Sequence, residues 1–180
     1  DLDATFGFYI NYSGVPEVGP TALPCDVDEY NPAFFGPGFF DGEGHVRLMN
    51  DLRTNAEFEQ FYLSRYTDLY NTTFSCENML NSLDSMMAII EPEMNQHADR
   101  WYGTYEEWYD NFSNLRTWVE DRCELLYTGM SDCYELTGPY DVVFNVDPPE
   151  AGYLKVNTLT HHDLPWTGTY FGGMDNKLVA

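Results

Sequence analysis

A helix is predicted most directly by Ala56-Glu-Phe-Glu-Gln-Phe-Tyr-Leu-Ser-Arg-Tyr-Thr-Asp-Leu-Tyr70. Five of its residues recur at i, i+3, i+4, i+7 and i+11, the spacing of one helix face: Phe58, Phe61, Tyr62, Arg65 and Leu69. The helical period continues through a longer region, from about Val46 to Glu135. We therefore expect the centre of the chain to be helical.

Three more helices are expected after this one. Ser75 is a suitable N-cap for the second, whose apolar residues form one stripe that we expect to pack in the core: Met79, Leu80, Leu83, Met86, Met87 and Ile90. Pro92 falls in the first turn of the third, which runs towards Gly103. Thr104-Tyr-Glu-Glu107 is a capping box that opens a long fourth helix. The short connections predict that neighbouring helices pack antiparallel.

The sequence pattern changes on both sides of the helices. Residues 1–44 are rich in Gly, Pro and aromatic residues, so they predict either a functional loop or a surface loop pinned by Phe34, Phe35, Phe39 and Phe40. After residue 138 the period falls to about two, with turns at Pro and Gly, which predicts a small antiparallel meander. The expected class is α+β, in three segments: a loop segment 1–44, a helical bundle 45–137 and a β-rich segment 138–180.

Composition restricts the partners of the chain. Thirty acidic residues against eight basic ones give a formal charge of −22 over 180 residues. This field repels phosphate backbones and anionic lipids, so nucleic acid and acidic membranes are not expected as partners. It favours divalent cations and basic peptides, or it serves only solubility. No apolar run approaches the ~20 residues of a membrane span, so no membrane insertion is expected.

The cysteines and sequons together favour an extracellular or envelope protein. The four cysteines, Cys25, Cys76, Cys123 and Cys133, contain no close Cys-x-x-Cys pair, which disfavours a structural zinc site. They allow three disulfide connectivities, of which a Cys123–Cys133 pair would close the most local loop. Three Asn-x-Ser/Thr sequons begin at Asn11, Asn71 and Asn111.

Asp1 and Asp3 are the candidate metal ligands. They alternate on an extended segment, and a turn at Ala4-Thr-Phe-Gly7 would bring both carboxylates to one ion. Hard oxygen ligands suit magnesium or calcium. The alternative is a solvated turn, because an Asp-x-Asp pair is common in acidic chains.

Three further groups of polar residues have weaker signals. His161-His162-Asp163 could ligate a transition metal, but adjacent histidines project differently, so a polar turn is favoured. His97 and Arg100 are expected to hydrogen-bond the preceding loop. Arg65 and Arg122 align with apolar helix faces, so we expect both to be partly buried in bidentate pairs with carboxylates.

Several motifs, in this order, resemble the spore-coat CotH-type kinase family. Asp1-Leu-Asp-Ala-Thr-Phe-Gly7 resembles the Trp-Asp-x-Asp-x-Thr-aromatic-Gly segment of that family, and Arg47 to Phe61, followed by Arg65, resembles its helix with Leu, Asn, Phe and Arg. The further matching segments are Glu91 to Trp101, Phe112 to Arg122, Ala151 to Asn157 and Pro165 to Gly173.

This resemblance implies a fold and a reaction. The fold would be the helical C-lobe of a divergent protein-kinase-like fold, followed by the β-meander. The reaction would transfer phosphate from ATP to Ser-type hydroxyls of surface or coat proteins, outside the cell or on its surface. Asp1 would bind Mg²⁺ or another divalent cation, with Asp3 as an auxiliary ligand. The nucleotide-binding lobe, its lysine and the catalytic base would precede Asp1, so the chain is expected to be a fragment, inactive without its N-terminal half.

The sequence is also compatible with two alternatives. The parent protein could be a pseudokinase, a non-catalytic structural or adhesive component of an extracellular assembly built on the same scaffold. A calcium-stabilised binding module is supported by the charge alone and ranks last.

Overall fold

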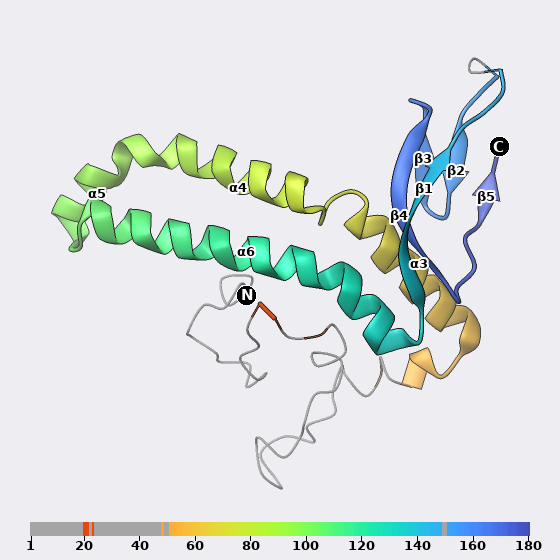
Figure 1. Cartoon of the computed structure of the whole chain (residues 1–180). Coiled ribbons are helices and arrows are strands. Elements are labelled where there is room, and N and C mark those ends of the chain that lie inside the picture. Colours follow the sequence, from red (N-terminus) through yellow and green to blue (C-terminus); the bar gives the residue numbers. More distant parts are fainter. Residues whose placement is uncertain (1–19, 22, 24–47, 49–50, 149–150) are drawn as a thin grey trace, which may run out of the picture.

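The computed structural model describes residues 20, 21, 23, 48, 51–148 and 151–180 of the chain. Helices come first and antiparallel strands follow, which confirms the α+β class (Figure 1). The elements are α3 (Ala56–Tyr70), α4 (Cys76–Ile90), the 3-10 helix η3 (Glu91–Glu93), α5 (Met94–Trp101), α6 (Tyr105–Tyr134), β1 (Thr137–Phe144), β2 (Leu154–Val156), β3 (Leu159–His161), β4 (Trp166–Gly172) and β5 (Leu178–Val179). In this part of the chain, no helix is both long enough and apolar enough to cross a membrane.

Local sequence sets the starts of the helices. The side chain of Asn55 accepts hydrogen bonds from two backbone N–H groups at the start of α3. Ser75 caps α4 as predicted, and Thr104 with Glu107 forms the predicted capping box of α6. Each cap supplies acceptors to N–H groups that have no partner within the helix.

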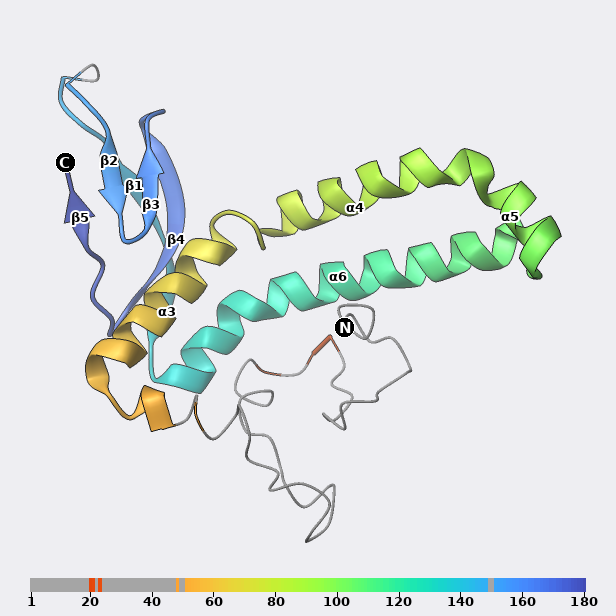
Figure 2. The ribbon, with the colours of Figure 1, turned by 180° about the vertical axis from the view of Figure 1, so that it is seen from behind.

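Helices α4 and α6 lie side by side as a long antiparallel hairpin, with α5 at its tip (Figures 1 and 2). Helix α3 lies at the opposite end, beside the strands. The antiparallel packing of neighbouring helices is therefore confirmed for this pair.

The apolar stripe of α4 was expected to be core, and this prediction is wrong. No residue of α4 is buried, and the side chain of Met86 is 60% exposed. The reason is that α4 packs mainly on α6. A pair of helices encloses only the seam between them, so the rest of an apolar stripe faces solvent.

The strands form two small antiparallel sheets. Strand β1 pairs with β4, with Asp141 opposite Thr169 and Val143 opposite Thr167. Strand β2 pairs with β3 on one side and with β5 on the other. The antiparallel pattern agrees with the alternation in the sequence, but the pairing order is not that of a single meander.

Two apolar clusters hold these layers together. The first joins α3, α6 and β4 through Leu63, Tyr70, Met130, Leu136 and Phe171. The second joins the two sheets through Phe144, Leu154, Val156 and Tyr170. Each fully buried side chain of this size contributes about 1.5–3 kcal/mol through the area that it removes from water. The core therefore lies at the junction of α3 with the sheets, and the α4–α6 hairpin projects away from it.

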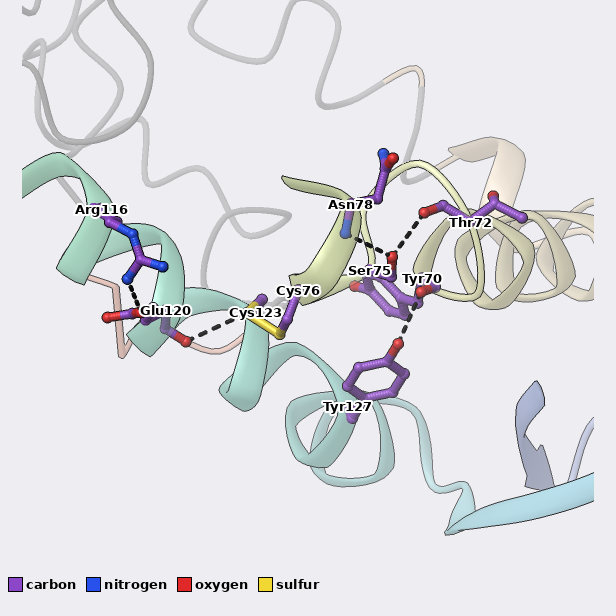
Figure 3. The surroundings of a disulfide bond; sticks show 9 residues. All are labelled: Tyr70, Thr72, Ser75, Cys76, Asn78, Arg116, Glu120, Cys123 and Tyr127. Carbon is purple, nitrogen blue, oxygen red and sulfur yellow. Dashed lines mark hydrogen bonds and ion pairs between the residues drawn. A yellow bond between two sulfur atoms is a disulfide. The ribbon is translucent and has the colours of Figure 1, made fainter. Parts of the chain in front are cut away.

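A disulfide joins the start of α4 to the middle of α6. It links Cys76 to Cys123, with their Cα atoms 5.4 Å apart (Figure 3). Beside it, the Tyr127 hydroxyl donates a hydrogen bond of 2.8 Å to the carbonyl of Tyr70, which ties α6 to the end of α3. The pairing differs from the Cys123–Cys133 pair that proximity in the sequence predicts.

That Cys123–Cys133 pair is wrong. Both residues lie on the single helix α6, ten positions apart. A helix rises about 1.5 Å per residue, so their Cα atoms are separated by roughly 15 Å, well beyond the ~7 Å that a disulfide can span. Cys133 is itself disulfide-bonded.

Candidate functional site

The predicted metal ligands, Asp1 and Asp3, lie outside the described residues, so the metal site stays a prediction. Within the ranges that the structure describes, no group of three or more His, Cys, Asp and Glu side chains is placed to hold a metal ion. A group of hydrogen-bonded polar side chains lies instead where α3 meets the strands, and we call it the junction.

Asp68 is the centre of this junction. Of the described carboxylates, it is the one that is completely buried, at 0% exposure. Its Oδ2 accepts hydrogen bonds from the Thr158 backbone N–H at 2.9 Å and the Thr158 hydroxyl at 2.5 Å, and its Oδ1 accepts from the Asn157 amide at 3.4 Å. Asn157 has a φ of 51°, a left-handed conformation that Asn tolerates better than most residues. Asp68 therefore fixes the turn between β2 and β3 against α3.

Arg65 extends the same network at the surface. Its Nη1 donates to the Thr158 hydroxyl oxygen at 2.9 Å. Arg65 is exposed, so the prediction that it is partly buried is wrong: it lies on the solvent edge of the α3 face that meets the β2–β3 turn. Arg122 is half-buried, as predicted, and its Nη1 donates to the Pro20 carbonyl at 3.4 Å. Its predicted pairing with a carboxylate stays a prediction.

Two amide side chains, Gln60 of α3 and Asn71 at its C-cap, bind the backbone of the strand region in the same manner. The Asn71 side chain donates to the Thr169 carbonyl at 2.8 Å and accepts from the Thr169 N–H at 2.7 Å. The Gln60 side chain donates to the Asp175 carbonyl at 2.8 Å and accepts from the Asp175 N–H at 2.9 Å. Each amide thus satisfies both polar groups of one residue, as a neighbouring strand would. Together with Asp68 they attach the C-terminal region to α3 at three points.

Replacing Asn71 with Asp should weaken this attachment. Asn71 Nδ2 donates to the carbonyls of both Thr67 and Thr169, and a carboxylate oxygen would face these two acceptors instead. We expect the free energy of unfolding to fall by about 2 kcal/mol, because the Thr169 carbonyl loses this donor and the new carboxylate oxygen faces two partly buried carbonyl oxygens. Urea unfolding of Asn71→Asp measures this. Asn111→Asp, at an exposed position of α6, is the matched control, and an equal loss in both variants would contradict the assigned role.

His161 and Tyr170 belong to the same junction, and both are close enough to Asp68 to be influenced by its charge. The His161 ring stacks on Trp166 with centroids 3.6 Å apart, and its Nε2 is buried with no hydrogen-bond partner. Burial lowers the pKa of His161, although the negative charge of Asp68 opposes this change. Burial, and secondarily the charge of Asp68, raises the pKa of Tyr170 well above its ordinary value. The neutral forms of both side chains are therefore favoured at neutral pH.

The stability of the fold should consequently depend on His161 at mildly acidic pH. The folded state has the lower pKa, so below the unfolded value of about 6.5 the unfolded chain binds the proton first and unfolding becomes easier. We expect the melting temperature to fall between pH 7.5 and 5.5, and to fall less in His161→Phe, which keeps the stacked ring but cannot titrate. His162→Phe is the control, because His162 lies against Tyr153 instead. Identical pH profiles for all three proteins would show that His161 has no such role.

His97 and Arg100, which were expected to hydrogen-bond the preceding loop, lie on α5 at the tip of the hairpin. The Arg100 guanidinium lies over the Trp101 ring, 5.2 Å from its centroid. His97 is exposed. The side chains of His161 and His162 do not point to a common metal position. The His161 ring lies against Trp166, and the His162 ring lies against Tyr153.

The junction positions the fold and does not itself react. The Asp68 carboxylate is closed off from solvent, and both of its oxygens already accept hydrogen bonds from residues 157 and 158. Sequence reasoning missed Asp68. The available signal was its position three residues after Arg65 on the same helix, where two side chains can share a partner.

Comparison with known proteins gives one match. A family model described as CotH kinase protein matches residues 1–126, which include the Asp1–Gly7 segment, α3, α4, α5 and much of α6. The strands lie beyond the matched residues. Searches of curated proteins and of solved structures find no match. Because the family model covers well over half of the 180 residues, the chain belongs to the CotH kinase protein family.

Proposed function

We propose that this chain is part of a CotH-like protein kinase that transfers phosphate from ATP to Ser-type hydroxyls of surface or coat proteins. The observation that carries the proposal is the family match over residues 1–126, which includes the two aspartates together with the helices. We further propose that the protein acts outside the cell. The Cys76–Cys123 disulfide supports this location, because disulfides persist mainly in oxidising compartments.

In this proposal Asp1 and Asp3 supply hard carboxylate oxygens, which are the donors that Mg²⁺ prefers. When bound, the ion would neutralise charge that develops on the phosphates during transfer. Asp1 is assigned as the principal ligand and Asp3 as the auxiliary one. The lobe that binds the nucleotide and the catalytic base would come from polypeptide that precedes Asp1.

The test is phosphate incorporation by a polypeptide that carries the nucleotide-binding lobe together with this chain. Incubation with radiolabelled ATP, Mg²⁺ and a Ser-containing acceptor protein should label the acceptor. Asp1→Asn should lower the rate by at least about a hundredfold, because the ion would lose its principal ligand. Asp99→Asn, at an exposed position of α5, is the matched control and should keep the full rate.

Two results would contradict the proposal. One is labelling that is unchanged in Asp1→Asn. The other is the absence of labelling by the wild type while Asp1→Ala and Asp3→Ala variants still bind a surface partner, which would favour a structural or adhesive protein on the same scaffold.

A further inference from the structure

An open apolar groove of about 270 Å³ lies between α4 and α6. It is independent of the junction at Asp68 and of the predicted metal ligands. Its apolar lining comes from both helices and from the turn before α4: Phe74, Met79, Leu83, Met86, Leu115 and Val119.

The α4 wall of this groove remains accessible to water. Helix α4 has no buried residue, and the side chains of Phe74 and Met86 are 45% and 60% exposed. Most of the groove surface is apolar, so apolar side chains of a partner would be removed from water on binding there. Met79, Leu83 and Met86 follow one another at i, i+4 and i+7, so they present a continuous row along the helix.

The open form of the groove favours side chains of a protein over a small molecule. Small-molecule sites usually enclose most of the ligand, whereas this groove is open along the hairpin and its volume lies at the lower end of their range. From Met79 to Met86 the row extends for roughly 10 Å, which corresponds to about two turns of a helix lying along it. Methionine side chains are flexible and polarizable, so they adapt to the side chains that contact them.

The charge of the hairpin indicates what kind of helix would bind. From Cys76 to Val119 the chain has eight acidic residues and two arginines. Both arginines are already engaged, since Arg116 is paired with Asp84 and Glu120, and Arg100 lies over Trp101. The field around the groove therefore attracts cationic partners and repels acidic ones.

We propose that the α4–α6 groove binds a basic amphipathic helix of a partner protein. The apolar row of that helix would occupy the groove, and its Lys and Arg side chains would lie in the negative field of the hairpin. Binding of an amphipathic helix through anchors at i, i+3, i+4 and i+7 is a general mode of recognition. The proposal does not depend on phosphate transfer.

The test uses a fluorescently labelled peptide of about 18 residues that contains only Lys and Leu, with Leu at helical i, i+3, i+4 and i+7 spacing. The peptide has no hydroxyl group, so it cannot be a phosphate acceptor and its binding is independent of kinase activity. Anisotropy titration of the 180-residue chain should give a Kd in the range of ~1–10 µM, weakening as salt is raised from about 0.1 to 0.5 M. Met86→Gln and Met79→Gln should each weaken binding about tenfold.

Controls distinguish binding in the groove from non-specific binding of the peptide to the acidic surface. Ile89→Gln changes a residue of the same helix that is 76% exposed and does not line the groove, so it should leave Kd unchanged. A peptide with the same composition but scrambled Leu positions, and one with Glu in place of Lys, should bind at least about tenfold more weakly. Circular dichroism should show that all variants keep the wild-type helix content.

Four results would overturn the proposal. They are an absence of Lys/Leu peptide binding up to about 100 µM, an equal loss of affinity in Ile89→Gln and Met86→Gln, equally tight binding of the Glu/Leu peptide, and self-association of the chain that Met86→Gln abolishes. The last result would assign the groove to a second copy of this chain.

Discussion

Removal of the Cys76–Cys123 disulfide is expected to lower the free energy of unfolding by about 4 kcal/mol. The bond joins residues 47 positions apart. In the chain-entropy description, a cross-link over a loop of this length restricts the unfolded chain by about that amount. Cys76→Ser combined with Cys123→Ser leaves no free thiol from this pair, so the double variant isolates its contribution.

Urea unfolding under non-reducing conditions measures this difference. The effect should be concentrated in the hairpin, because α4 has no buried residue and depends on this link and on its seam with α6. Hydrogen exchange should therefore increase more in α4 than in α3. Thr128→Ala, at an exposed position of α6, should change stability by less than about 0.5 kcal/mol. A loss below about 1 kcal/mol in the double variant would show that helix packing alone holds the hairpin.

Asp68→Ala is expected to have the second largest effect, a loss of about 3 kcal/mol. The buried carboxylate accepts hydrogen bonds from the N–H and hydroxyl of Thr158 and from the Asn157 amide. Hydrogen bonds to a charged acceptor contribute about 1.5–3 kcal/mol, and removal of the side chain also leaves a cavity. Thr158 is exposed and can turn to water, which limits the loss.

The variant should loosen the strand region before the helices. Limited proteolysis should cleave residues 151–180 of Asp68→Ala faster than in the wild type, while α6 stays protected. Asp121→Ala is the matched control, because Asp121 is exposed on α6. Equal protease sensitivity of the two variants would contradict the role of Asp68 as the attachment of the β2–β3 turn.

The helices could be predicted from the sequence because their signals are local. The spacing of Phe58, Phe61 and Tyr62 predicted a helix from Ala56 to Tyr70, which are the bounds of α3 in the structure. The capping box at Thr104 and Glu107 marked the start of α6 in the same way. Caps and periodicity act within a few residues, so they can be read without knowledge of the tertiary fold.

The features that depend on distant residues could not be predicted. The partner of Cys123 was missed because loop length favours near neighbours, whereas a continuous helix holds Cys133 too far away. The apolar stripe of α4 has the spacing of a core face. Its spacing does not show that only one helix, α6, packs against it. Asp68 acts through residues about 90 positions later in the chain, so its spacing from Arg65 shows that the two share a helix face but does not identify their common partner.

The central claim is that Asp1 holds the divalent cation of a phosphotransferase, and Mn²⁺ binding tests it most directly. Electron paramagnetic resonance can count Mn²⁺ ions bound to the polypeptide that carries both lobes, in the presence of ATP. The account predicts that Asp1→Asn weakens Mn²⁺ binding at least about tenfold, while Asp99→Asn leaves it unchanged. Equal Mn²⁺ affinity in the wild type and Asp1→Asn would contradict the claim.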